Sequence, residues 1–282
     1  MTKKTSIAAL TGLAMLIGVC GFAGRSQAQD VPKHIVSFNL CGDQLLVALA
    51  DPGQIAGLSP YAANAALSVV AKEAMKFPRL DWNTESVVNL APDLILVGPS
   101  DRPTRAILSA TGLRVVEVGL ISDLAAARQQ AREIGALIGH PERGEALAHA
   151  LEQAEQKLAA VAFKPPRTAS VVQRGGWTEG PQSLVSAMLT VAGLRSPPFA
   201  AAGFGGYVSM EQLLVDGPDI LVLQDPPREA ADQGALFITH PALLAKYGPK
   251  RRIDMPSRYA LCGGPALVQG LDFLSAAITA LR

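Results

Sequence analysis

The chain has 282 residues, with 25 Lys and Arg against 24 Asp and Glu, so its formal net charge at pH 7 is +1. So small a charge gives no electrostatic reason to expect a nucleic acid or an anionic membrane surface as a partner. A hydrophobic fraction of 49% with only 5% aromatic residues indicates helices that cover parallel sheets, and the length fits two domains of ordinary size.

The first 28 residues have the pattern of a cleavable secretory signal. Lys3 and Lys4 precede an apolar stretch over residues 7–22, and Ser26-Gln27-Ala28 offers small residues at the positions that a signal peptidase reads. The signal peptide is therefore predicted to cover residues 1–28 and to be removed from a secreted product.

Three cysteines are present in the whole chain. Cys20 could serve as the modified residue of a lipoprotein, but Val19 before it is bulkier than such sites usually accept, so a soluble product is expected. Cys41 and Cys262 lie near opposite ends of the mature chain, where they either form a disulfide or remain two separate buried thiols. A thiolate metal site needs more ligands than these two, so no metal site is predicted.

The first half of the mature chain alternates apolar runs with helical patterns. Strands are predicted at residues 34–38, 54–58, 94–97 and 115–118, with residues 39–43 as a turn into the first helix. The right-handed crossover rule then gives a parallel sheet.

Residues 122–162 form a long helical region in the middle of the chain. Gly139-His140-Pro141 divides this region into two helices, because Pro141 suits a first helical turn. A helix of about 20 residues spans roughly 30 Å, which is enough to connect two domains. The second half continues with predicted strands at residues 168–173, 220–223 and 252–255 and helices at residues 181–192, 242–247 and 265–281.

One sequence unit occurs in each half. Residues 82–97 and 208–223 share a Glu near a helix start, a Pro-Asp pair and an apolar run, and Glu85 and Glu211 are 126 positions apart (211 − 85 = 126). Proline ends the helix, and the short apolar run suits a strand buried on both faces. The repeat predicts two similar α/β lobes, although such a unit is common enough to arise twice by chance. The predicted boundaries are 29–138 for the first lobe, 139–163 for the connecting helix and 164–282 for the second lobe.

These features together resemble the periplasmic solute-binding proteins of ABC importers, in the helix-linked branch that carries cobalamin, ferric siderophores and haem. The resemblance implies two Rossmann-like lobes with parallel sheets joined by a single long α-helix. It also implies a monomeric periplasmic protein without a resident cofactor, which captures a small-molecule metal chelate and delivers it to an ABC permease dimer in the inner membrane. Glu85 and Glu211 match the family's permease-docking positions.

Ligands of doubly wound sheets sit beyond the carboxyl ends of the strands, so the loops there are predicted to bind the ligand. Aromatic faces would pack against a bulky chelate, arginines would favour an anionic one, and a tyrosine would serve haem as axial ligand. Phe204 and Asp225 lie in these loops too. The residues predicted to bind the ligand are Asn39, Cys41, Tyr61, Trp82, Arg102, Arg174, Trp177, Tyr207, Arg258 and Tyr259.

Two other classes of function stay open at this stage. A ligand sensor or partner-docking module could use the same fold without a role in transport. An enzyme has less support, because the common nucleotide, hydrolase and zincin motifs are missing and only a nucleophilic Cys41 remains as a candidate.

Overall fold

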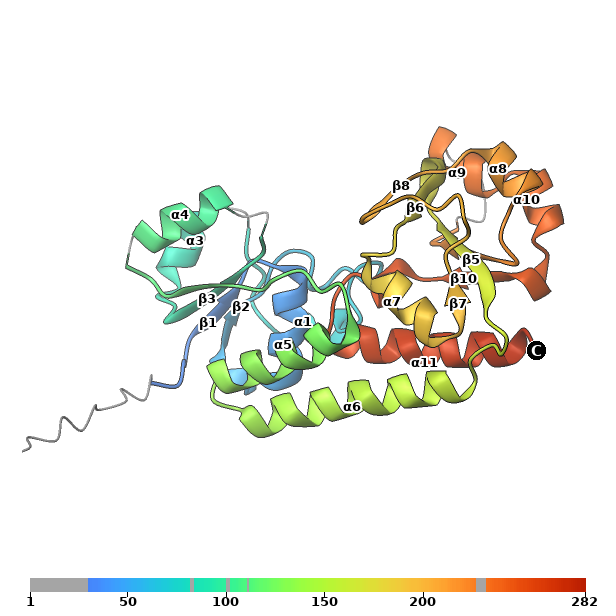
Figure 1. Cartoon of the computed structure of the whole chain (residues 1–282). Coiled ribbons are helices and arrows are strands. Elements are labelled where there is room, and N and C mark those ends of the chain that lie inside the picture. The colour runs from blue at the N-terminus through green and yellow to red at the C-terminus, as the bar shows by residue number, and fades with distance from the viewer. Residues whose placement is uncertain (1–29, 82–83, 100–101, 111, 227–231) are drawn as a thin grey trace, which may run out of the picture. The chain divides into compact units, whose positions relative to one another are not determined.

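The computed structural model describes residues 30–81, 84–99, 102–110, 112–226 and 232–282 (Figure 1). The predicted signal peptide lies outside these residues. Within the described ranges, none of the helices has both the length and the apolar character needed to cross a membrane.

The first sheet is wholly parallel, as the sequence predicts. Its strand order is β2-β1-β3-β4, and β1 pairs in parallel with both β2 and β3. All four residues of β3 are buried, as expected of a strand that helices cover on both faces. The strands are β1 (Ile35–Ser37), β2 (Ile55–Gly57), β3 (Leu94–Val97) and β4 (Val115–Glu117).

The second sheet is mixed: it contains the predicted parallel strands and adds β6 and β8, which join it through antiparallel pairing. Its order is β10-β9-β5-β6-β8, with β7 also paired to β5. β5, β7, β9 and β10 pair in parallel, whereas β6 pairs antiparallel with β5 and β8. The strands are β5 (Arg167–Val172), β6 (Trp177–Glu179), β7 (Leu194–Arg195), β8 (Gly205–Tyr207), β9 (Ile220–Gln224) and β10 (Arg252–Met255).

A tight glycine turn produces the antiparallel pair. Between β5 and β6 the chain forms the 3₁₀ turn η2 (Arg174–Gly176), in which Gly175 and Gly176 have φ of 70° and 82°. Residues with a Cβ rarely adopt this conformation, so the glycine pair lets the chain reverse at once. A crossover helix is therefore unnecessary at this point.

The repeated unit has the same structure in both halves. Helix α3 (Thr84–Asn89) precedes β3, and helix α8 (Met210–Val215) precedes β9. The two helices start 126 positions apart and have the same length of 6 residues. β3 and β9 each pair in parallel with the first strand of their own half, β1 and β5.

Helix α6 (Pro141–Ala160) is the 20-residue helix that the sequence predicts between the halves. It packs against α5 (Leu124–Leu137) and α11 (Pro265–Ala280), and Figure 1 shows α5 beside one end of α6 and α11 beside the other. α5 and α6 approach closely at two glycines, since a Cβ added to Gly135 would lie 2.7 Å from the Cα of Gly144. Leu151 and Leu158 of α6 join the core of the second half. The domain boundaries remain a prediction.

The remaining helices are short and cover the two sheets. Helix α1 begins at Leu40, four residues earlier than predicted, because Asn39 caps it: its Oδ1 accepts hydrogen bonds from the backbone N–H groups of Cys41 and Gly42. The other elements are α1 (Leu40–Leu49), η1 (Pro52–Gln54), α2 (Ala71–Ala74), α4 (Arg102–Ala110), α7 (Leu184–Val191), α9 (Gln233–Ile238), α10 (Pro241–Lys246), η3 (Pro249–Arg251) and η4 (Ser257–Tyr259).

Candidate functional site

A cavity of about 380 Å³ is lined by residues from both halves of the chain. The carboxyl ends of β4, β5, β9 and β10 all lead into loops that line it, which agrees with the rule for ligand sites in α/β sheets. Its volume falls in the range of roughly 300–1,000 Å³ that is typical of small-molecule sites. The lining residues are Leu67, Leu120, Ile121, Gln173, Arg174, Glu179, Gln182, Ser183, Leu184, Val185, Phe204, Gln224, Asp225, Ser257, Ala260 and Leu261.

Part of the cavity lining is apolar and open to solvent. Leu120, Phe204 and Leu261 are large hydrophobic residues with 77%, 62% and 45% of their surface exposed. Exposed apolar groups that gather around one cavity mark a surface on which another molecule is bound. This part of the site suits the apolar body of a ligand.

Another part of the lining is a polar cluster of Gln173, Glu179 and Gln224. The Nε2 group of Gln173 donates to Oε1 of Glu179 and to Oε1 of Gln224, both at 2.6 Å. Burial raises the pKa of Glu179 above its ordinary value of 4.5, although hydrogen bonds from Ser183 and Gln173 oppose the shift. A half-buried carboxyl group in a cavity is a candidate for ligand recognition.

Asp225 stands at the point where β9 ends and the cavity begins. Its φ of 47° is uncommon for a residue with a side chain, although aspartate tolerates it better than most. The Oδ1 atom accepts a hydrogen bond of 3.1 Å from the backbone N–H of Ser257, and the backbone N–H of Asp225 donates to the carbonyl of Met255. These bonds join the loops after β9 and β10 where both line the cavity.

Of the predicted ligand-binding residues whose side chains the structure describes, Arg174 lies in the cavity lining. It forms an ion pair with Asp232, the N-cap of α9. The pKa of Asp232 lies below its ordinary value because the backbone N–H of Ala235 and the guanidinium of Arg174 both donate to it. The positive charge of Arg174 is therefore already balanced within the protein.

Arg258 and Tyr259 lie beside the cavity rather than among its lining residues. Nη1 of Arg258 donates to the carbonyl oxygen of Ala65 at 2.9 Å, which connects the two halves of the chain. The ring of Tyr259 packs against Phe273, with 5.5 Å between the centroids, and against the core of the second half. Both residues are half-buried and serve packing between neighbouring elements.

Trp177 and Tyr207 form a pair on the antiparallel strands. They are cross-strand neighbours of β6 and β8, and their rings meet edge to face with 5.3 Å between centroids. Tyr207 is 77% exposed. Glu179 and Phe204 of the cavity lie at the other end of the same strand pair, so the aromatic pair extends the surface next to the cavity.

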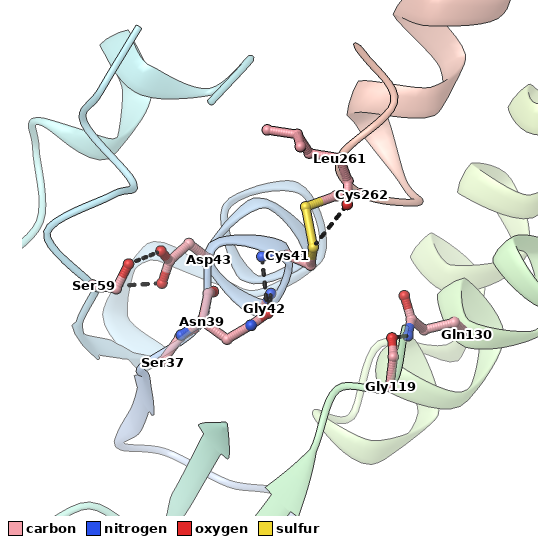
Figure 2. The surroundings of a disulfide bond; sticks show 10 residues. All are labelled: Ser37, Asn39, Cys41, Gly42, Asp43, Ser59, Gly119, Gln130, Leu261 and Cys262. Carbon is pink, nitrogen blue, oxygen red and sulfur yellow. Dashed lines mark hydrogen bonds between the residues drawn. A yellow bond between two sulfur atoms is a disulfide. The ribbon is translucent and has the colours of Figure 1, made fainter. Parts of the chain in front are cut away.

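Cys41 and Cys262 are joined in a disulfide, with 5.2 Å between their Cα atoms (Figure 2). The sequence left open a disulfide or two separate buried thiols, and the structure contains the disulfide. The bond ties the start of α1 to the loop before α11, next to Leu261 of the cavity lining. A nucleophilic Cys41 is ruled out in this state, because its sulfur is already bonded. The side-chain oxygen of Asn39 caps α1, and Asn39, like Cys41, is not among the residues that line the cavity.

Asp43 of helix α1, two residues after Cys41, is completely buried. Its carboxylate accepts hydrogen bonds from the backbone N–H of Ser59 at 3.1 Å and from the Ser59 hydroxyl at 2.5 Å (Figure 2). Burial raises the pKa of Asp43 to about 6, against the effect of these bonds. Asp43 is thus a structural acid that fixes the loop after β2 to α1.

The remaining predicted residues lie elsewhere or outside the described part. Tyr61 is 45% exposed in the loop that also contains Leu67 of the cavity. Glu85 and Glu211 are both exposed in the first turns of α3 and α8. Trp82 and the side chain of Arg102 lie outside the described residues.

The sequence prediction missed the polar cluster. Gln173 and Gln224 each end an apolar strand pattern, so a search for polar residues at strand ends could have found them. Glu179 gave no such signal, because its position depends on the glycine turn that brings β6 back beside β5.

The chain belongs to the periplasmic binding protein family, whose model matches residues 35–246. Among solved structures, a periplasmic haem-binding protein from Pseudomonas aeruginosa is 23% identical, with a TM-score of 0.70, and the match covers 88% of this chain and 92% of that one. The periplasmic vitamin B12 binding protein of Vibrio cholerae is 15% identical with a TM-score of 0.69, over 89% of this chain and 98% of that one.

A third similar structure is described as a possible iron-binding, periplasmic solute-binding protein from Staphylococcus epidermidis. It is 18% identical with a TM-score of 0.70, and the match covers 88% of this chain and 99% of that one. A search of curated protein sequences found no match. At these identities the structural likenesses establish the two-lobed α/β fold, which agrees with the family assignment.

Proposed function

We propose that this protein is the substrate-binding component of an ABC importer and captures a metal chelate of the ferric siderophore or cobalamin type in the cavity between its two halves. The observation that carries the proposal is a cavity that both halves line, at the carboxyl ends of four parallel strands, in a chain of the periplasmic binding protein family. Its apolar rim and polar cluster offer packing and orientation to one bulky ligand.

The proposed cycle places the protein in the periplasm, after removal of residues 1–28. The ligand binds without chemical change, and the loaded protein docks on a permease dimer through Glu85 and Glu211. Two exposed carboxylates at equivalent places on the two halves would give a two-fold permease both orientation and a faster association rate. Release of the ligand into the permease completes the cycle, so the protein is not an enzyme in this proposal.

Haem is a second candidate ligand, because haem-binding proteins are among the similar structures. It would take an axial ligand from the protein, for which Tyr61 and Tyr207 are exposed candidates near the cavity loops. A sharp change in the haem absorption spectrum on binding would support this alternative.

The test is native mass spectrometry of the purified mature protein with cobalamin, haem and a panel of ferric siderophores. One-to-one binding of an intact chelate, confirmed by calorimetry, is the expected result. Turnover of the chelate, or failure of every chelate to bind, would overturn the proposal.

A further inference from the structure

The charged side chains of the cavity lining favour negative potential. The lining contains one cationic side chain, Arg174, and two anionic ones, Glu179 and Asp225, so the described lining has a formal charge of −1 (+1 − 2). The one cation is paired with Asp232. Within the described lining, little positive charge therefore remains to attract an anionic ligand.

The hydrogen bonds of the polar cluster also disfavour an anionic ligand. Both N–H groups of the Gln173 amide are directed to protein oxygens, those of Glu179 and Gln224. The donors of the Gln173 amide are thus used within the protein, whereas the carboxylate of Glu179 has two oxygens with several acceptor sites. A ligand donor placed beside Glu179 can use the acceptor sites that Gln173 leaves open on the carboxylate.

The position of Glu179 strengthens its preference for a ligand group that donates a hydrogen bond. The residue is half-buried, and the β5–β6 pairing and the amide of Gln173 hold its carboxyl group in the cavity lining. A hydrogen bond to a charged acceptor is stronger than one between neutral groups, and it is stronger still where water is partly excluded.

We propose that Glu179 is the specificity-determining residue of this cavity and accepts a charge-assisted hydrogen bond from an ammonium group of the bound chelate. Neutral and cationic chelates then bind in preference to anionic ones. The inference rests on the proposed function, since it concerns the same cavity, and it names the class of chelate that the cavity accepts.

The experiment compares two forms of one chelate. Ferrioxamine B carries a free ammonium group, and N-acetylferrioxamine B has the same iron centre without that charge. Ferric enterobactin serves as the anionic probe. Dissociation constants are measured by calorimetry for the wild type, for Glu179→Gln and for Glu152→Gln, an exposed glutamate of α6 whose replacement changes the net charge by the same amount.

The wild type and Glu152→Gln are expected to bind ferrioxamine B roughly tenfold or more tightly than its acetylated form. In Glu179→Gln this ratio should fall to about one, and binding of ferric enterobactin should improve. The ratio for the wild type should also decrease on acidification, as Glu179 becomes protonated, which tests the idea without any variant.

A wild-type preference for ferric enterobactin, or an unchanged ratio in folded Glu179→Gln, would overturn the role of Glu179 and leave chelate capture intact. Failure of the wild type to bind any of these probes, cobalamin or haem would instead overturn the proposed function, and this inference with it. Circular dichroism of each variant establishes that it is folded.

Discussion

Asp219 and Thr168 hold the starts of two neighbouring strands together by reciprocal hydrogen bonds. The backbone N–H and the hydroxyl of Thr168 both donate to Oδ2 of Asp219, at 2.8 and 2.9 Å, and the backbone N–H of Asp219 donates to the Thr168 hydroxyl oxygen at 2.9 Å. In the first half, Asp93 accepts from the backbone N–H groups of Lys33 and His34. The aspartate of the repeated Pro-Asp pair thus aligns the central strand with the first strand in both sheets.

We expect Asp219→Ala to lower the free energy of unfolding by about 1–2 kcal/mol, because Thr168 loses its acceptor. These hydrogen bonds lower the pKa of Asp219 from its ordinary value of 3.8, with the Thr168 backbone N–H as the largest cause. The stabilisation is therefore complete above the ordinary pKa and is lost as the pH falls below it. Urea unfolding at about pH 6 and about pH 3 should show a smaller difference between variant and wild type at the lower pH.

Asp216→Ala, at an exposed position near Asp219, is the matched control and should leave stability nearly unchanged. An equal loss in both variants would contradict the assigned role of Asp219.

Asp43 should have the opposite pH dependence. Its pKa in the folded protein is about 6, above the ordinary 3.8, so the folded state holds its proton more tightly than the unfolded state does. Stability due to this group is greatest below the ordinary pKa and falls as the pH rises through about 6, by about 3 kcal/mol in total. Asp43→Asn should gain stability relative to the wild type between about pH 4 and about pH 7, measured by urea unfolding. A constant difference over that range would show that Asp43 does not titrate as described.

Removal of the disulfide should destabilise the protein. The bond closes a loop with a sequence separation of 221, so Cys41→Ala with Cys262→Ala should cost roughly 2–5 kcal/mol. Thermal unfolding with and without a reducing agent checks this expectation. The reductant should lower the midpoint of the wild type and have no effect on the double variant; a midpoint that is unaffected in both would show that the bond contributes no stability.

The proposed docking role makes a separate prediction. Glu85→Ala with Glu211→Ala should leave chelate affinity within about twofold of the wild type, because both residues lie outside the cavity lining. Uptake through the permease, reconstituted in proteoliposomes, should be lost, since charged docking pairs set orientation and association rate. Equal transport by the double variant would refute the role, and Glu152→Ala controls for the loss of surface charge.

Much of the fold could be predicted because it is encoded locally. Pro92 and Pro218 each follow a helix that cannot continue through them, because proline is not tolerated in a helix interior. Uninterrupted apolar runs such as residues 94–97 and 220–223 have few alternatives to a buried strand. Strands β6 and β8 escaped prediction, because each is short, β8 is rich in glycine, and both depend on antiparallel pairing, β6 with β5 and β8 with β6.

The candidate site was harder to predict than the fold. Whether Arg174 faces a ligand as a free cation depends on Asp232, 58 residues further along the chain, which pairs with it. Asn39 appeared as a loop residue open to ligand, but its oxygen caps α1. Such assignments depend on contacts between distant segments, and these are absent from any single stretch of sequence.

The disulfide also has a consequence for the order of assembly. Cys41 and Cys262 are separated by 221 positions, so this bond can close only after that whole stretch of chain has been synthesised. Cys20, in the predicted signal, is the only other cysteine of the chain. Removal of the predicted signal would leave oxidation within a single molecule with just one possible product, so no isomerase would be needed to correct the pairing.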